Sequence, residues 1–218
     1  MISRTSGLFH TVLFMDWILA SQSPRRKQLL GELLTNFEII PAVGEESCDG
    51  AKTCARLVET LARAKAQEVA NLERAKSKAV IGSDTVVTLR GEVMGKPKDQ
   101  ADARRMLCAL SGRTHKVYTG VCISVPTKTG RKEFVKSACT RVKFNALSLK
   151  QIDEYIATGS PMDKAGAYGI QDGGLVKSIK GSFSCVVGFP QELCKKMIKQ
   201  ATKYALKTQG EKNVETCD

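Results

Sequence analysis

Val80-Ile81-Gly82-Ser83-Asp84-Thr85-Val86-Val87 is a nearly continuous run of apolar and β-branched residues. This pattern is typical of a buried strand. The run extends to Leu89 and is followed by the turn signal Arg90-Gly91. Residues 79–94 are therefore predicted to form a β-hairpin with its first arm inside the protein.

Asp84 is the one acid in this apolar run. An ionised carboxylate is costly to bury unless a cation or hydrogen-bond donors accompany it. Beside a metal ion or lysines, such a carboxylate could orient or deprotonate a water molecule. The alternative is an ordinary turn or capping aspartate.

Helices and strands alternate on both sides of the hairpin. Further strands are predicted at residues 17–20, 37–42, 114–125, 133–144, 175–179 and 185–187, and helices at 24–34, 52–74, 99–110, 148–158 and beyond Pro190. Because the order lacks a strict βαβ period, the predicted fold class is α/β with a mixed sheet. Residues 1–15 are interpreted as an N-terminal extension, 16–206 as a single domain and 207–218 as a disordered tail.

The overall charge points to anionic partners. The chain of 218 residues has 34 Lys and Arg against 22 Asp and Glu, a net charge of +12. Nucleotides, nucleic acid or an acidic surface would be attracted to such a protein, although many of these side chains could simply form a solvated surface. Aromatic RNA-binding motifs and zinc-finger spacings are absent from the sequence, which weakens a dedicated nucleic-acid function.

The cysteine and histidine content narrows the chemistry. None of the eight cysteines forms a C-x-x-C pair, and the sequence has two histidines, His10 and His115. A structural zinc site is not expected, and a serine or cysteine nucleophile would find almost no histidine base. Cysteines within apolar runs indicate a reducing compartment, and we expect the cytoplasm. Carboxylates, lysines and arginines must then carry any catalysis.

Targeting signals are weak. No apolar run reaches the roughly 18–20 residues that span a bilayer, so no membrane association is expected. The first 15 residues contain Arg4, serines and threonines but no acid, a composition that resembles a transit peptide. A ragged extension, or a core that starts at Met15, is the competing interpretation.

Two helices carry cations in unusual places. Arg25-Arg26-Lys27 follow Ser23-Pro24 at a predicted helix start, where positive side chains oppose the helix dipole and bound phosphate would reconcile them with it. At 100° per residue, Lys65 falls in the middle of an apolar stripe that includes Leu61 and Val69. These side chains either line an anion-binding cleft or extend into water.

Three loops supply further candidates. Lys96 lies between Gly95 and Pro97 at the end of the hairpin. Glu45 and Glu46 are adjacent acids in a predicted loop and suit a hard divalent cation, although they could be ordinary surface residues. In residues 165–171, small side chains precede Gln171, whose amide could read the edge of a base; a structural turn is the alternative.

Several motifs occur in a fixed order along the chain. They are Ser21-Gln22-Ser23-Pro24-Arg25-Arg26, Gly82-Ser83-Asp84-Thr85-Val86-Val87, Gly95-Lys96-Pro97, Asp163-Lys164-Ala165-Gly166-Ala167-Tyr168-Gly169-Ile170-Gln171, Gly181-Ser182 and Val186-Val187-Gly188-Phe189-Pro190. Together, across residues 16–205, they resemble the Maf-like nucleotide pyrophosphatases. The Tyr-Gly-Ile-Gln form of the late loop is similar to the subgroup that prefers dTTP and UTP.

The resemblance implies an elongated, two-lobed fold around a central cleft, related to inosine triphosphatase-like enzymes and often dimeric. It implies hydrolysis between the α and β phosphates with a divalent cation, usually Mg²⁺. By matching position, Asp84 corresponds to the catalytic acceptor and, with Glu46, to a metal-binding group. Phosphate-binding positions match Arg25, Arg26, Lys65 and Lys96, and positions for substrate choice match Arg25, Thr85 and Gln171.

The chain departs from the family pattern at three positions. Ser83 replaces a common alanine, Asp172 a common glycine and Phe183 a usual tyrosine. Asp172 matters most, because it adds an anion directly after the proposed base reader and is expected to disturb the pocket. The main rival function is a non-catalytic nucleic-acid-binding protein that uses the basic surface.

Overall fold

The computed structural model describes residues 15–44 and 52–210 of the chain. Within them, seven strands form one mixed sheet in the order β2-β1-β3-β5-β6-β7, with β4 beside β3. Their bounds are β1 Trp17–Leu19, β2 Glu38–Ile39, β3 Ala79–Leu89, β4 Glu92–Met94, β5 Thr114–Thr127, β6 Gly130–Phe144 and β7 Val176–Lys180. The predicted buried run is thus the strand β3, which pairs with β1, β4 and β5.

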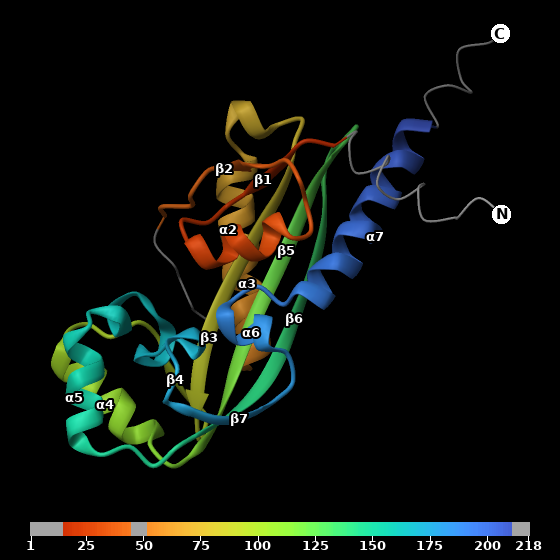
Figure 1. The fold of residues 1–218 in the computed structure, drawn as a ribbon. Coiled ribbons are helices and arrows are strands. Elements are labelled where there is room, and N and C mark those ends of the chain that lie inside the picture. The colour runs from red at the N-terminus through yellow and green to blue at the C-terminus, as the bar shows by residue number, and fades with distance from the viewer. Residues whose placement is uncertain (1–14, 45–51, 211–218) are drawn as a thin grey trace, which may run out of the picture.

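Helices cover both faces of the sheet. The α-helices are α2 Pro24–Gly31, α3 Cys54–Ala70, α4 Gln100–Leu110, α5 Leu149–Ala157, α6 Phe183–Val187 and α7 Gln191–Gly210, and the short 3₁₀ helices are η1 Glu73–Ala75, η2 Ser160–Asp163, η3 Ala165–Ala167 and η4 Ile170–Asp172. In Figure 1, α3 lies behind the long strands, while α2, α6 and α7 lie in front of them. The expected α/β class with a mixed sheet is confirmed.

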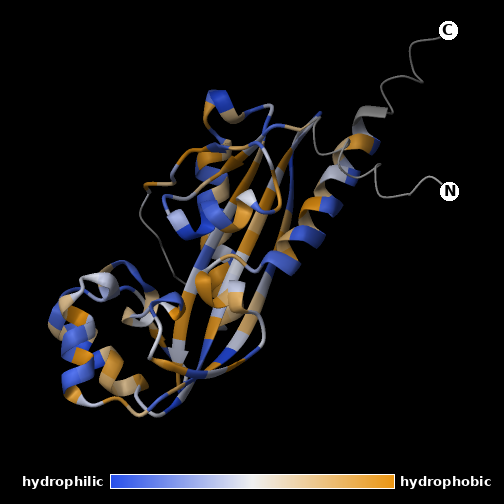
Figure 2. Cartoon of the chain, in the orientation of Figure 1, coloured by the Kyte–Doolittle hydropathy of each residue, from blue (hydrophilic) through white to orange (hydrophobic). Residues whose placement is uncertain are grey.

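The core is divided along the length of the sheet into two lobes. In the upper lobe of Figure 1, Ile81 packs with α2 and α7 on one face of β3, and Val80 packs with α3 on the other. In the lower lobe, α4 and α5 pack against the far ends of β3, β5 and β6. Along α7, hydrophobic and hydrophilic residues alternate, as expected of a helix with one buried side (Figure 2). The long strands join the lobes into the expected elongated fold.

Helix α3 lies unusually close to the sheet at two glycines. A Cβ on Gly82 would lie 2.2 Å from the Ala62 carbonyl oxygen, and one on Gly120 would lie 2.1 Å from the Val58 carbonyl oxygen. Any larger residue would collide with the helix backbone. These glycines therefore set the distance between α3 and the centre of β3.

The lower lobe buries a histidine in an aromatic cluster. The His115 ring is 2% exposed, makes edge contacts with Phe144 and Tyr168, and its Nε2 lies 2.8 Å from the Tyr168 hydroxyl. Burial lowers the pKa of His115 from 6.5 to about 4. The imidazole is therefore neutral in the folded protein at neutral pH.

This burial predicts a loss of stability in acid. Between pH 6.5 and 4 the unfolded chain binds a proton that folded His115 does not, so the stabilisation present above pH 6.5 is lost as the pH falls towards 4. From pH 7 to 4.5 the loss is about 2 kcal/mol. Urea unfolding of wild type and His115→Gln at both pH values measures it, with the variant expected to lose less. Equal losses in the two proteins would contradict the prediction.

The structure corrects some predicted elements. Residues 185–187 belong to the helix α6 rather than a strand, because the Ser182 side chain accepts a hydrogen bond from the Cys185 backbone N–H and caps a helical turn. The predicted strand 37–42 is reduced to β2, and α2 ends at Gly31 rather than residue 34. The helix predicted for 52–74 ends at Ala70 and is followed by η1. Helix α7 extends four residues into the predicted tail, to Gly210.

Other predicted elements agree with the structure. Arg90 and Gly91 form the turn of the β3–β4 hairpin with φ angles of 53° and 92°. Ser148 and Gln151 form the predicted capping box. Residues 1–14, 45–51 and 211–218 lie outside the described residues. Within 15–44 and 52–210, no helix combines the length and apolar character needed to cross a bilayer.

Candidate functional site

The candidate site lies where two neighbours of β3 leave a gap. Strand β5 pairs with one edge of β3 from Val80 to Thr88. On the other edge, β1 pairs with residues 79–81 and β4 with residues 87–89. Neither β1 nor β4 therefore pairs with residues 82–86 on this second edge. Asp84 is at the centre of this open segment.

A cleft of about 750 Å³ lies at this gap between the lobes. All predicted site residues within the described ranges line it: Arg25, Arg26, Lys65, Asp84, Thr85, Lys96 and Gln171. Asp163 and Lys164, which are not among the predicted site residues, also line the cleft. They directly precede residues 165–171, which we call the small-residue loop, and this position in the sequence could have identified them. In total, five cationic and two acidic side chains line the described part of the cleft.

Asp84 and Lys65 form an ion pair in the cleft. The Lys65 Nζ donates to Asp84 Oδ1 at 2.5 Å, and the two side chains are 17% and 9% exposed. Lys65 follows Ala62 by one turn of α3, so the close approach of the helix at Gly82 brings its ammonium to the carboxylate. Lys65 therefore supplies the opposite charge that compensates for the burial of Asp84.

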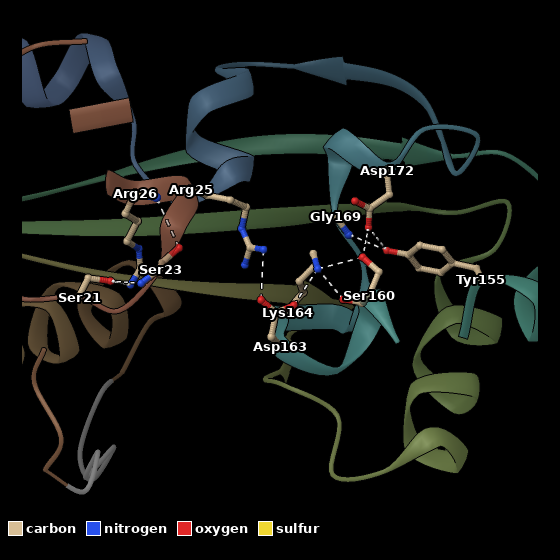
Figure 3. A network of polar contacts seen from close by, with 10 residues as sticks. All are labelled: Ser21, Ser23, Arg25, Arg26, Tyr155, Ser160, Asp163, Lys164, Gly169 and Asp172. Atoms are coloured by element: carbon tan, nitrogen blue, oxygen red, sulfur yellow. Dashed lines mark hydrogen bonds and ion pairs between the residues drawn. The ribbon is translucent and has the colours of Figure 1, made fainter. Parts of the chain in front are cut away.

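The partners of Arg26 include three neutral oxygen atoms. Its Nε donates to the Gly188 carbonyl at 3.0 Å, and its terminal nitrogens donate to the hydroxyls of Ser21 and Thr85, both at 3.3 Å. Figure 3 shows the guanidinium beside Ser21. Ser83, a departure from the family pattern, places its hydroxyl 3.0 Å from the same Gly188 carbonyl. The positive charge of Arg26 is thus fixed at the cleft wall.

The orientation of the Thr85 hydroxyl follows from its neighbours. Thr119 donates its hydroxyl proton to the Cys185 carbonyl at 2.7 Å. The 3.0 Å bond between the two threonine hydroxyls must then use the Thr85 proton. Thr85 in turn accepts from Arg26. In this structure the hydroxyl of Thr85 positions Arg26 at the cleft wall.

Arg25 bridges the two lobes across the cleft. Its Nη1 lies 3.2 Å from Asp163 Oδ2, and Lys164 Nζ donates to Asp163 Oδ1 at 2.7 Å (Figure 3). Burial opposes ionisation of Asp163, but the two cations outweigh it and hold the pKa of its carboxyl below the usual value. The Arg25 pair is partly exposed, at 26% and 61%, so it contributes little stability and can exchange for a bound anion.

The remaining predicted residues lie at the rim. Lys96 and Gln171 are both exposed and line the cleft. The loop of Lys96 is tied to the small-residue loop by a 2.9 Å bond from the Gly166 N–H to the Gly95 carbonyl. Glu46 and Glu45 lie outside the described residues. In the described ranges, no group of three or more His, Cys, Asp or Glu side chains is arranged to hold a metal ion.

The arrangement suits a multiply charged anion. Cations from α2, α3, the β4–α4 loop and the η2–η3 loop line the same cleft as one buried carboxylate, Asp84. Such a cleft can neutralise phosphate oxygens while the carboxylate orients a water molecule.

Most of this chain is similar to known proteins of one family. The profile of the family described as "Maf-like protein" matches residues 16–201. A dTTP/UTP pyrophosphatase of Thermococcus gammatolerans is 48% identical over 183 residues, covering 83% of this chain and 94% of that protein. Another of Anaeromyxobacter sp. is 43% identical over 187 residues, covering 84% and 88%.

A solved structure confirms the fold class. The Ham1 protein of Staphylococcus aureus aligns with a TM-score of 0.50 over 85% of this chain and 98% of that chain, at 16% sequence identity. At this identity the likeness concerns the fold, and it agrees with the inosine triphosphatase-like architecture expected from the sequence.

Proposed function

Since this chain belongs to the Maf-like family, we propose that it is a nucleoside triphosphate pyrophosphatase that converts dTTP and UTP to the monophosphate and pyrophosphate. Relatives at 43% and 48% identity carry the name dTTP/UTP pyrophosphatase. The observation that carries the proposal is the convergence of distant cationic residues on one carboxylate in a single cleft. The rival function, nucleic-acid binding without catalysis, does not account for that carboxylate.

The cations act on the phosphate chain. Arg26 and Lys65 are held in place by contacts within the protein, so they can bind phosphate oxygens without a large reorganisation cost. Arg25 exchanges Asp163 for a phosphate, and Lys96 approaches from the opposite rim. Together they stabilise the charge that develops on the leaving pyrophosphate.

Asp84 acts on the attacking water. Its carboxylate accepts the water proton as the oxygen attacks the α-phosphorus, and the bond from that phosphorus to the bridging oxygen breaks. The products are a monophosphate and pyrophosphate. Lys65, whose Nζ donates to Asp84 Oδ1 at 2.5 Å, orients the carboxylate for this role.

The family suggests a requirement for a divalent metal, and we propose Mg²⁺. Protein-bound Mg²⁺ commonly uses one or two carboxylates together with substrate phosphates and waters. The carboxylate of Asp84 in the cleft fits this donor set, and Glu46, outside the described residues, would be the second ligand. The ion would supply additional charge neutralisation on the phosphates.

Substrate choice is assigned to Arg25, Thr85 and Gln171. The Gln171 amide can donate to and accept from the carbonyl–NH–carbonyl edge that uracil and thymine share. Gln171 is exposed at the cleft rim next to the small-residue loop. Thr85 acts on selection through Arg26, which it holds.

We also propose a cytoplasmic homodimer. The six cysteines in the described ranges are free, and unpaired thiols are typical of a reducing compartment. Light scattering after size exclusion measures the oligomeric state directly.

A nucleotide panel tests the reaction. With Mg²⁺, the protein should release pyrophosphate and monophosphate from dTTP and UTP faster than from dATP or dGTP, and EDTA should stop the reaction. Separate assays for pyrophosphate and orthophosphate identify the bond that is cut. Orthophosphate with a diphosphate would place cleavage at the γ position and reject the proposal. Salt-sensitive duplex binding without turnover would favour the rival function.

A further inference from the structure

Asp172 ends the turn that carries the proposed base reader. Residues Ile170–Asp172 form η4, and the Asp172 N–H donates to the Gly169 carbonyl at 3.2 Å. Gly169, Ile170 and Gln171 line the cleft, whereas Asp172 is not among its lining residues. The anion expected to disturb the pocket therefore faces a different part of the lobe.

The Asp172 carboxylate is bound by two hydroxyl groups. Its Oδ2 accepts from the Tyr155 hydroxyl at 2.5 Å and from the Ser160 hydroxyl at 2.7 Å (Figure 3). The Tyr155 oxygen in turn accepts from the Gly169 N–H at 3.0 Å. One carboxylate oxygen thus ties both ends of the turn to helix α5, directly at Asp172 and through Tyr155 at Gly169.

The carboxylate is ionised at neutral pH. Burial opposes its ionisation, but the Tyr155 and Ser160 hydrogen bonds, with the charges of Lys164 and Arg25, hold the pKa of Asp172 below the usual value. Lys164 Nζ lies 3.0 Å from the Ser160 hydroxyl oxygen. Hydrogen bonds therefore link Asp172 through Ser160 to Lys164, one of the cations that line the cleft.

The Gly169 backbone packs closely against the side chains of Asp172 and Lys164. A Cβ on Gly169 would lie 2.7 Å from Asp172 Oδ2 and 2.9 Å from Lys164 Cε. The carboxylate and the lysine stem therefore pass directly over the Gly169 backbone. Removing the carboxylate frees one side of the turn that presents Gln171.

We propose that Asp172 is a positioning residue for base selection: its carboxylate, with Tyr155 and Ser160, holds the 169–172 turn so that Gln171 meets a pyrimidine edge. The inference rests on the proposed function and extends it to a residue that departs from the family pattern. Asp172 itself does not touch the nucleotide. It acts by limiting the positions that the Gln171 amide can take.

Variants of the contact test the proposal. For wild type, Asp172→Asn, Asp172→Gly and Tyr155→Phe, kcat and KM are measured with dTTP, UTP and dATP. The dTTP preference over dATP should fall about 10-fold in Asp172→Gly and a few-fold in Asp172→Asn, because a neutral acceptor binds the hydroxyls less strongly. The change should reside mainly in the KM for dTTP. Combining Asp172→Gly with Tyr155→Phe should add little, because both remove the same contact.

Hydrogen exchange gives a readout that does not depend on turnover. The Gly169 N–H, which donates to Tyr155, should exchange faster in Asp172→Gly and Tyr155→Phe than in wild type. Glu154→Gln is the matched control, because it removes an exposed acid next to Tyr155 in the sequence, which pairs with Lys150 at 3.9 Å. This control should keep both the preference and the exchange rate.

The possible outcomes separate the two proposals. A wild-type protein that cleaves none of the nucleotides rejects the proposed function, and exchange at Gly169 then decides whether Asp172 holds the turn. An equal loss for dTTP and dATP, a sharper dTTP preference, or unchanged exchange in Asp172→Gly overturns the positioning role.

Discussion

Asp84→Asn is expected to lower kcat for dTTP by about 10²-fold or more while the protein stays folded. The substitution keeps the shape of the side chain but removes its charge and its ability to take up a proton. An amide oxygen in place of Oδ1, which lies 2.5 Å from Lys65 Nζ, can still accept the hydrogen bond from Lys65. The loss should therefore appear in kcat. A cooperative thermal unfolding transition should show that the variant is folded.

Asp153→Asn is the matched control for this loss. Asp153 is an exposed aspartate that pairs with Arg104 at 2.7 Å and does not line the cleft. The same chemical change there should leave kcat within a factor of about two, because exposed ion pairs contribute little. Near-normal kcat in folded Asp84→Asn would remove Asp84 from the catalytic role.

Gly120→Ala is expected to destabilise the protein by about 3 kcal/mol, at the upper end for an overpacked core. Its new Cβ would lie 2.1 Å from the Val58 carbonyl oxygen, so α3 must move away from β5. Gly120 pairs with Asp84 across the sheet. A displaced α3 would also withdraw Lys65, and the molecules that remain folded should show a lower kcat.

Gly31→Ala provides the comparison. Gly31 ends α2, and an added Cβ there meets no atom within 4 Å. Its urea midpoint should be unchanged or slightly raised, because alanine favours a helix over glycine. If Gly120→Ala unfolds at the same urea concentration as wild type, α3 does not need the close approach that the structure shows.

Local sequence patterns predicted many of the elements but not all of their boundaries. The apolar run of β3 and the capping box at Ser148 were readable because strand periodicity and helix capping act over a few neighbouring residues. A strand is predicted at 185–187, yet the Ser182 cap and the turn at Gly188 make this segment a helix. There a local cap outweighed β propensity.

The candidate residues could be selected from the sequence, but their contacts could not. Lys65 stood out on an apolar helix face and Asp84 in an apolar strand, since each is costly to bury alone. That they meet depends on α3 approaching the sheet at Gly82 and Gly120.

The sequence by itself determined the α/β class, the order of the motifs and the residue types that suit phosphate. Only the tertiary structure decided that Thr85 holds Arg26 and that Asp172 turns away from the cleft to Tyr155. The physical reason is the distance along the chain over which each kind of interaction acts. Periodicity and capping depend on neighbours in the chain, whereas a side chain of short reach can turn to either side, and the partners packed around it select the direction.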